Sequence, residues 1–337
     1  MLNFAEDRFI TIESDGLAVQ PRLDEIIGAL IADGAENLFF LGAGGVMFLT
    51  QPAFDILRTR SSFPVYYEMG AELVERGNVN LGPRSIVVTP SVSGTTPEAI
   101  TALEYAKAKG ATLITFTGHP DTPIGAIADH NFMCLVVDDT SSEMYYLQTL
   151  LVALSVMKAR GEIADYDDVV AELLRLPALL VEVKREFEDN ARDLARAIAA
   201  DDYHMMVGAG SAWPQAHYYG MCILEEMQWI RTRPVHASDF FHGALELVEP
   251  GVSVIILKGE DATRQLAERV EAFAPRFTEK VHVLDTKAFA LPGISDRTRA
   301  LISQVLLATV LERVSAHLEV IRDHPLTTRR YYKQMAY

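Results

Sequence analysis

A cluster of hydroxyl side chains follows a short apolar run in the first third of the sequence. The run at residues 86–88 leads into residues 89–96, which read TPSVSGTT, and an apolar pattern with a helical period begins at Pro97. A strand, a small-residue loop and a helix in this order leave several backbone N–H groups aimed at one place, where the helix dipole is positive. This geometry binds anions.

Side chains of the loop would complete the anion site with further donors and room for close approach: Ser91, Ser93, Gly94, Thr95, Thr96. Hydroxyls can donate to phosphate oxygens, and a glycine lets the backbone come close. The loop contains no Lys or Arg, which favours a sugar phosphate over a nucleoside triphosphate, whose loop ends in Gly-Lys-Ser/Thr. The alternative is an ordinary helix N-cap, for which one hydroxyl is enough.

Glu226 is the second candidate for chemistry. Cys222 and Trp229 lie about one helical turn away, so its carboxylate projects from a largely apolar face, where a charge is costly unless it is paired or functional. Burial favours the protonated form of a carboxylate, which suits such a group to carry a proton between carbon atoms. The alternative is a structural ion pair with Arg231 or Arg233.

A histidine follows Glu226 in the next irregular segment. His242 precedes Gly243, and His236 lies a few residues earlier. A histidine near neutral pH can act as acid or base, but a single one is more often structural than catalytic. The residues alone leave the choice between His236 and His242 open.

Composition restricts the possible partners of the chain. The net charge is −16, with 46 acidic and 30 basic residues among 337, so we expect the chain to repel nucleic acids. It shows neither a signal-peptide pattern nor a membrane-spanning apolar run, which predicts a cytoplasmic protein without a membrane partner. Cys134 and Cys222 are expected to be buried thiols. No cluster has metal-ligand spacing, and we predict no metal and no other cofactor.

Strands and helices alternate along the chain, which predicts an α/β fold. Such alternation implies right-handed crossovers and a doubly wound parallel sheet between two layers of helices, a flavodoxin-like or Rossmann-like three-layer sandwich. We expect one amphipathic helix within residues 1–35, an acidic connector at 161–168 and a long helical stretch at 169–200. The first half is predicted to hold strands at 38–41, 65–67, 86–88, 112–116 and 132–137, and helices at 47–58, 97–109 and 142–160.

The second half of the sequence looks like a diverged copy of the first. LFFLGAGG at 38–45 is matched by MMVGAGSA at 205–212, and SIVVT at 85–89 by SVIIL at 253–257. After the second of these matches the copy reads KGED, whose carboxylates would repel phosphate. Gly44 lies in the glycine-rich turn of the first match, at residues 42–45. This turn lacks the glycine spacing of a dinucleotide site, and it would let a sugar approach the backbone.

The pattern Ser-x-Ser-Gly-x-Thr between a strand and a helix resembles the phosphosugar-binding loop of the SIS (sugar isomerase) domain family. The resemblance extends over nearly the whole chain. It implies two tandem SIS domains, at residues 1–165 and 166–320, followed by a tail at 321–337 that covers the active site.

The resemblance also assigns roles to single residues. In the isomerase half of glucosamine-6-phosphate synthase, a catalytic glutamate is followed at the same spacing by His-Gly, which implies Glu226 and His242 here. Ser141 and Ser142 resemble a second hydroxyl cluster near the sugar. Lys333 matches a lysine that opens the sugar and holds it as an imine. The alternative for this tail is a solvated basic end.

The synthase's glutaminase domain has no counterpart in this sequence, so the full-length resemblance is to fructosamine-6-phosphate deglycases. It implies a hydrolase that converts a 6-phosphorylated Amadori compound into glucose 6-phosphate and a free amine or amino acid. Glu226 would move a proton from C1 to C2, and water would hydrolyse the resulting imine. The resemblance further implies a homodimer, or a dimer of dimers, with the active site at the subunit interface and His242 reaching into the partner's pocket.

Two other functions stay open. An aldose–ketose isomerase, or an aminosugar-phosphate isomerase or deaminase, would use the same proton transfer on another substrate. A non-catalytic sugar-phosphate sensor would need the phosphate loop but not the Glu226–His242 pair. The sequence does not specify the amine portion of the substrate.

Overall fold

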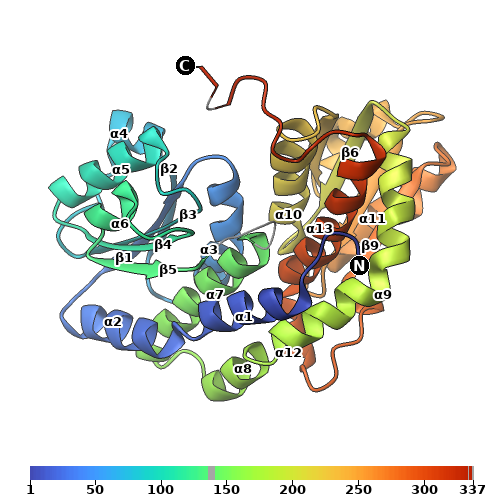
Figure 1. Cartoon of the computed structure of the whole chain (residues 1–337). Helices are drawn as coiled ribbons and strands as arrows, with labels where there is room; N and C mark the ends of the chain where they lie inside the picture. Colours follow the sequence, from blue (N-terminus) through green and yellow to red (C-terminus); the bar gives the residue numbers. More distant parts are fainter. Residues whose placement is uncertain (136–140, 333, 336–337) are drawn as a thin grey trace. The chain divides into compact units, whose positions relative to one another are not determined.

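The computed structural model describes residues 1–135, 141–332 and 334–335. The chain divides into two compact units (Figure 1). One unit is Glu6–Pro177, and the other combines Met1–Ala5 with Ala178–Tyr337. Each unit has its own parallel sheet, and each is described by itself.

The unit Glu6–Pro177 is built on a five-stranded parallel sheet in the order β2-β1-β3-β4-β5. From β1 the chain passes to β2 on one side, and then to β3 on the other side, so β1 and β3 are neighbours whose crossovers depart in opposite directions. The strands are β1 (Asn37–Gly42), β2 (Val65–Met69), β3 (Ser85–Ser91), β4 (Thr112–Thr117) and β5 (His130–Met133).

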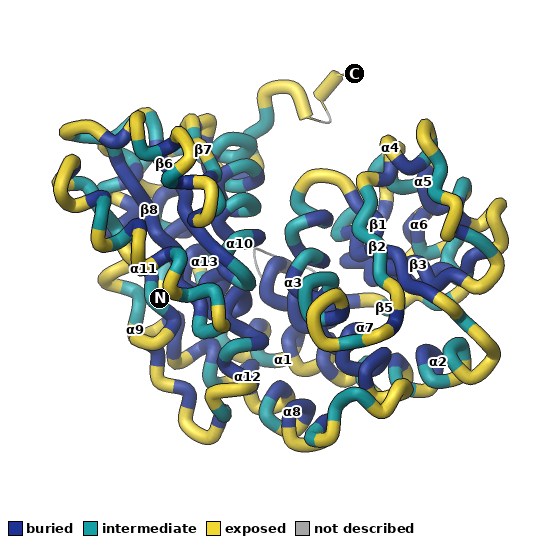
Figure 2. The backbone as a smooth tube through the Cα atoms, turned by 180° about the vertical axis from the view of Figure 1, so that it is seen from behind, coloured by how far each residue is buried: buried dark blue, intermediate teal, exposed yellow. Residues whose placement is uncertain are grey.

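Helices cover this sheet. They are α1 (Glu6–Leu17), α2 (Gln20–Ala32), α3 (Gly45–Arg60), α4 (Gly70–Arg76), α5 (Pro97–Ala108), α6 (Pro123–Ile127), α7 (Ser141–Ala159) and α8 (Tyr166–Leu173). Every residue of β1 and β3 is buried (Figure 2), which explains their unbroken apolar runs, since a parallel sheet has helices on both faces. On one face Phe39, Val87 and Leu113 pack against Leu103 of α5 and Ile124 of α6.

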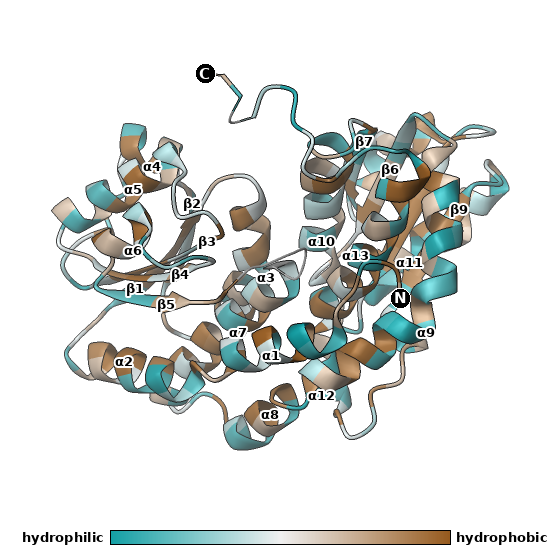
Figure 3. Ribbon diagram, in the orientation of Figure 1, coloured by the Kyte–Doolittle hydropathy of each residue, from teal (hydrophilic) through white to brown (hydrophobic). Residues whose placement is uncertain are grey.

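The other unit has a four-stranded parallel sheet in the order β7-β6-β8-β9, the same order as the first four strands of the first sheet. Its strands are β6 (Tyr203–Gly208), β7 (Arg231–His236), β8 (Ser253–Lys258) and β9 (Val281–Asp285). Its helices are α9 (Leu176–Ala199), α10 (Ala212–Tyr218), α11 (Arg264–Phe273), α12 (Asp296–Leu301) and α13 (Ser303–Ile321). A π-helical segment (Tyr219–Glu225) follows α10, and short 3₁₀ segments lie at Phe240–His242, Ala244–Leu247, Ala274–Arg276 and Thr286–Ala288. Hydrophobic residues run through the strands of both sheets (Figure 3).

The first residues of the chain are anchored in this second unit. The ring centroid of Phe4 lies 5.3 Å from the Nζ of Lys184 and 5.3 Å from the Cζ of Arg313. Both of these basic side chains are fully buried. The backbone N–H of Leu2 donates to Glu188 at 2.8 Å, and Glu188 also pairs with Arg313 at 2.8 Å. Burial would raise the pKa of Glu188, but the hydrogen bonds from Arg313 and Leu2 outweigh it and lower the pKa to about 2.

The structure confirms the predicted strands and helices of the first half in type and order, with several differences. Two short helices, α4 and α6, were not predicted, and β5 ends at Met133, before the predicted end of that strand. The first 35 residues form two helices, because α1 buries Phe9, Ile12 and Leu17 on one face of a segment that is otherwise polar. The connector at 161–168 already contains the start of α8. The long helical stretch is divided into α8 and α9, since Pro177 sits in the first turn of a helix, where its missing N–H costs nothing. Residues 136–137 of the last predicted strand lie outside the described residues.

Among the helices of the described residues, none is long and apolar enough to cross a membrane.

Candidate active site

The hydroxyl loop lies between the end of β3 and the start of α5. Ser91 is the last residue of β3, and its Oγ accepts a hydrogen bond from the N–H of Gly94 at 3.1 Å. The Oγ of Ser93 accepts from the hydroxyl of Thr95 at 3.1 Å. Thr96 is the N-cap residue of α5, yet within the described part of the chain its side chain makes no capping hydrogen bond. An ordinary N-cap therefore does not explain the Thr96 hydroxyl.

Gly94 holds the loop against the segment that leads into α6. Its φ is +61°, and a Cβ atom at this position would lie 2.4 Å from the Cβ of Thr122. Its carbonyl accepts from the N–H of Ile124 at 3.2 Å. The backbone conformation and the close approach both require glycine here.

Gly44 lies in the neighbouring loop, after β1. It is the exposed N-cap residue of α3, with φ 56° and ψ −129°. Because β1 and β3 are adjacent parallel strands with diverging crossovers, this loop and the hydroxyl loop leave the same edge of the sheet at its topological switch point. Open α/β sheets bind their ligands in the crevice at this point.

The second predicted hydroxyl cluster is described only in part. Ser142 lies in the first turn of α7, with its hydroxyl 3.3 Å from a carboxylate oxygen of Glu143. The side chain of Ser141 lies outside the described residues. Their contact with a sugar stays a prediction.

The switch point of the second sheet is filled by a carboxylate of the chain itself. Asp261, in the loop after β8, accepts hydrogen bonds from the N–H and hydroxyl of Ser211 at 2.8 and 2.5 Å and from those of Thr263 at 2.8 and 2.5 Å. Burial would raise the pKa of Asp261, but these hydrogen bonds lower it. The predicted conflict between this loop and a phosphate thus has a geometric basis.

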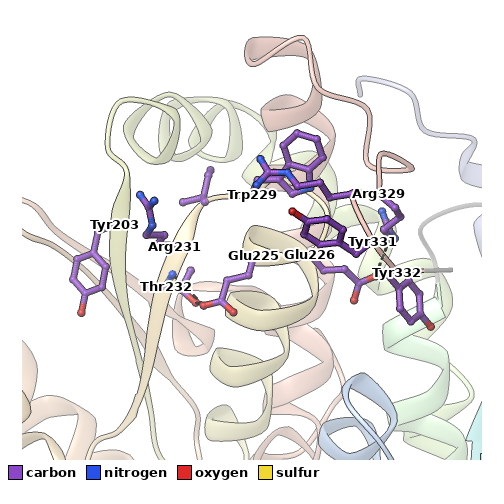
Figure 4. Close-up of a pocket in the computed structure, with 11 residues that line it drawn as sticks. Tyr203, Glu225, Glu226, Trp229, Arg231, Thr232, Arg329, Tyr331 and Tyr332 are labelled. Carbon is purple, nitrogen blue, oxygen red and sulfur yellow. Dashed lines mark hydrogen bonds and ion pairs between the residues drawn. The ribbon is translucent and has the colours of Figure 1, made fainter. Parts of the chain in front are cut away.

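Glu226 borders a pocket of about 830 Å³ at the amino ends of β6 and β7 (Figure 4). Tyr203 and Arg231, the first residues of these strands, line one part of it. Trp229 and the tail residues 329–332 line another. The pocket therefore combines carboxylates, guanidinium groups and aromatic rings.

The local structure of Glu226 differs from the expected regular helix. It directly follows the π-helical segment, and its N–H donates to the carbonyl of Met221 at 3.0 Å, five residues earlier. Its side chain is 32% exposed, and its Oε1 lies 2.9 Å from the Nε of Arg329. The ion pair that the structure shows joins Glu226 to the tail, whereas the sequence alternative named Arg231 or Arg233.

Glu225 and Cys222, two neighbours of Glu226, lie in the π-helical segment. Glu225 accepts from the N–H and hydroxyl of Thr232, at 3.1 and 2.7 Å, and so ties the end of the π-helical segment to β7. Burial, with smaller contributions from Glu226 and Glu225, raises the pKa of the Cys222 thiol to about 12. A thiol in this state is a poor nucleophile.

His242 does not line the pocket of Glu226. It ends the 3₁₀ segment after β7, is exposed, and donates its N–H to the carbonyl of Asp239 at 2.9 Å. Glu226 precedes the amino end of β7 and His242 follows its carboxyl end, and a strand of six residues is roughly 20 Å long. Within one chain the two side chains are therefore separated by the length of β7.

His236 has structural partners. Its ring packs edge-on against Trp213, with 5.3 Å between the ring centroids, and its Nδ1 accepts from the N–H of Ser238 at 3.2 Å. These contacts position the turn after β7.

The tail reaches the pocket through a tryptophan that sequence reasoning missed. The Cζ of Arg330 lies 3.9 Å from the ring centroid of Trp229, and the ring of His324 is 4.6 Å away on a T-shaped contact. Trp229 has φ +56°, a left-handed conformation that costs a bulky residue roughly 1–2 kcal/mol. Lys333 lies outside the described residues. The sequence feature that could have indicated this contact is the basic pair Arg329-Arg330 at the end of a strongly acidic chain.

Comparison with known proteins places these features in a family. The SIS domain model matches residues 32–158, which include the hydroxyl loop. A fructosamine deglycase of Bacillus subtilis is 30% identical over 95% of this chain and 97% of its own. The chain belongs to the SIS domain family. A fructoselysine 6-phosphate deglycase of Escherichia coli K12 is 28% identical over 93% of this chain and 90% of its own.

Solved structures of other proteins share the fold. A protein of Salmonella typhimurium described as a putative phosphosugar isomerase is 28% identical, with a TM-score of 0.87 over 95% of this chain and 97% of its own. The C-terminal domain of glucosamine-fructose-6-phosphate aminotransferase from Francisella tularensis has a TM-score of 0.77 at 15% identity over 96% of this chain and 97% of its own. The predicted α/β class, with parallel sheets flanked by helices, is confirmed.

Among the described residues, no group of three or more His, Cys, Asp or Glu side chains could hold a metal ion.

We predict that Gly94→Ala distorts the hydroxyl loop, because the added methyl group meets Thr122 and the left-handed backbone becomes strained. Stability should fall by about 1–3 kcal/mol, and sugar-phosphate affinity should fall with it. Thermal unfolding and calorimetric titration with glucose 6-phosphate would measure both. Gly82→Ala is the matched control, since a Cβ atom there meets nothing within 4 Å. Equal stability and equal affinity for glucose 6-phosphate in the two variants would contradict the prediction.

Proposed function

We propose that this SIS protein is a deglycase of 6-phosphorylated fructosamines, which releases glucose 6-phosphate and a free amine or amino acid. The observation that carries the proposal is the position of Glu226, a carboxylate at the edge of a large pocket and ion-paired at 2.9 Å. Support comes from the relatives named as deglycases, at 28–30% identity over most of the chain.

The proton that moves between the two carbon atoms needs one carrier. Glu226 removes a proton from C1 of the ketoamine, the C1–H electron pair forms the C1=C2 bond, and the C2 oxygen takes up a proton from water, which gives an enaminol and hydroxide. Glu226 then returns its proton to C2, and the nitrogen lone pair forms the C1=N bond of an iminium, which the hydroxide attacks at C1. The C1–N bond then breaks, and glucose 6-phosphate and the amine leave. The proton is returned, so the enzyme is unchanged.

Arg329 prepares Glu226 for the first step. A base must be ionised to accept a proton, and a neighbouring guanidinium favours the charged form of a carboxylate. Burial cannot set the charge state of Glu226 as the sequence predicts, because its side chain is about one third exposed. The ion pair with Arg329 of the tail takes this part and keeps the carboxylate charged.

The remaining predicted site residues complete the proposal. Ser91, Ser93 and Thr96, with the loop backbone, bind the phosphate, and Gly44 lets the sugar approach the backbone of the adjacent loop. Ser141 and Ser142 contact the sugar. Lys333 belongs to the tail that covers the site, and its imine chemistry is dispensable because a fructosamine carries its own nitrogen.

The separation of Glu226 and His242 along β7 supports a site shared between two copies of the chain. In a homodimer with twofold symmetry, His242 of one copy would assist ring opening of the sugar bound near Glu226 of the other. The matching strand orders β2-β1-β3-β4 and β7-β6-β8-β9 also support a tandem duplication, in which the first copy kept the phosphate loop.

We predict that the protein releases glucose 6-phosphate from fructoselysine 6-phosphate. The same preparation should form no glucosamine 6-phosphate from fructose 6-phosphate and ammonia. A coupled glucose-6-phosphate dehydrogenase assay and chromatography of the aminosugar would measure the two reactions. The reverse pattern would favour an isomerase or deaminase, and inactivity in both with retained phosphosugar binding would favour a sensor.

Glu226→Gln should lower turnover by at least about 10³-fold, since a neutral amide cannot accept the C1 proton. Binding of glucose 6-phosphate should be retained within about threefold, because the phosphate contacts are elsewhere. Steady-state kinetics and calorimetry would measure these effects. Glu225→Gln is the control: its amide oxygen can still accept from Thr232, so activity should stay within about tenfold of the original. Substantial turnover by the Glu226 variant would remove it from the mechanism.

A mixture of Glu226→Gln and His242→Ala chains should regain activity when they are co-refolded or co-expressed. Random pairing makes half of the dimers mixed, and each mixed dimer has one intact site, so about a quarter of the original activity should return. Each variant alone should stay inactive. If the mixture also stays inactive while mixed dimers form, Glu226 and His242 do not act across chains.

A further inference from the structure

We propose that Trp229 is a positioning residue: its indole ring seats Arg330 of the tail and thereby holds Arg329 against Glu226. The inference rests on the proposed function for its kinetic consequence alone. The seat itself is a structural claim and can be tested without any substrate.

The contact between ring and tail lies directly beside the ion pair of the proposed base. The guanidinium of Arg330 lies over the Trp229 ring, 3.9 Å from the centroid. The adjacent Arg329 reaches Glu226 at 2.9 Å, and Figure 4 shows this ion pair beside the Trp229 ring. Adjacent residues share one backbone, so a contact that fixes Arg330 also limits where Arg329 can point. A cation over an indole ring is the most favourable of the cation–π pairs.

The ring of Trp229 has a second contact with the tail, at His324 just after the end of α13. Gln228 is fully buried and donates its Nε2–H to the carbonyl of His324 at 2.8 Å, and the His324 ring packs edge-on against Trp229. Trp229 thus touches the tail at two points on either side of residues 325–329. The N–H of Leu326 donates to Glu319 at 3.0 Å, which ties the intervening segment to α13.

Hydrogen bonds within the tail hold the guanidinium of Arg329 in place. Its Nη1 donates to the carbonyls of Leu326 and Thr328 at 2.7 and 2.9 Å, while its Nε faces Glu226. The guanidinium therefore links the turn of the tail to the carboxylate. A shift of this turn would move Arg329 away from Glu226.

The backbone of Trp229 indicates that the ring, rather than the turn, is what this position requires. With φ +56°, the turn before β7 would be more relaxed with glycine. A bulky side chain in this conformation persists where its surroundings hold it, and such strain is typical of functional sites. Trp229 is 37% exposed as a residue, so it contributes less to the core than a buried tryptophan would.

Fluorescence tests the seat directly, because the chain has two tryptophans. In a Trp213→Phe background Trp229 is the sole tryptophan, and excitation at a wavelength that tyrosine does not absorb isolates its emission. Arg330→Gln should shift its emission to longer wavelength and increase quenching by acrylamide, whereas Arg330→Lys should preserve much of the original signal. Arg269→Gln is the matched control, since it removes a guanidinium 4.7 Å from the Phe241 ring elsewhere in the unit. Unchanged emission and quenching in Arg330→Gln would overturn the proposal.

Kinetics test the consequence for Glu226. Trp229→Gly should leave thermal stability equal or higher, because the strained backbone relaxes, while kcat falls about tenfold with little change in KM. Trp229→Phe should restore part of kcat, because a phenyl ring still attracts a cation. The double variant Trp229→Gly with Arg330→Gln should have nearly the same kcat as Trp229→Gly alone, because both substitutions remove the same contact between ring and guanidinium.

The outcomes separate this inference from the proposed function. If Trp229→Gly retains the original kcat, the positioning role is wrong and the deglycase activity stands. If the original chain is inactive on every substrate, the proposed function fails, and the Trp229 emission still decides whether the ring seats the tail.

Discussion

Adjacent parallel strands whose crossovers diverge leave a crevice at their carboxyl ends, and backbone donors point into it. Both sheets of this chain contain such a crevice, between β1 and β3 and between β6 and β8. In the first, the hydroxyl loop is held by Gly94 against Thr122 and keeps its donors in place for an anion. In the second, Asp261 takes the donors of Ser211 and Thr263 for itself. The donors at the two switch points are thus satisfied differently: a bound anion is the proposed acceptor in the first sheet, and the carboxylate of Asp261 is the acceptor in the second.

The proposed proton carrier lies away from these crevices, at the amino end of β7. Its counter-charge comes from a residue far along the chain, Arg329, whose Nε lies 2.9 Å from its carboxylate. This arrangement couples the chemistry to the docking of the tail. If the tail left the Trp229 ring, the pocket would lose one wall and Glu226 would lose its counter-charge at the same time.

Local sequence signals were sufficient for the strands, most helices and the hydroxyl loop, because each depends on neighbours in sequence. The failures have longer-range causes. The π-helical segment changes the side-chain period, so a regular helix does not give the correct face for Glu226. The partner of Glu226 comes from the tail, which no local pattern connects to it. The role of Trp229 depends on a backbone angle that the sequence does not display.

The anchoring of Phe4 between Lys184 and Arg313 has a consequence for how the protein is made. The unit Glu6–Pro177 is continuous, so all its strands exist once the ribosome has passed residue 177. Residues 1–5 belong to the other unit, and Arg313 lies in α13 near the far end of the chain. Residues 1–5 therefore reach their place in the fold only after α13 has been translated, more than 300 residues later than they are.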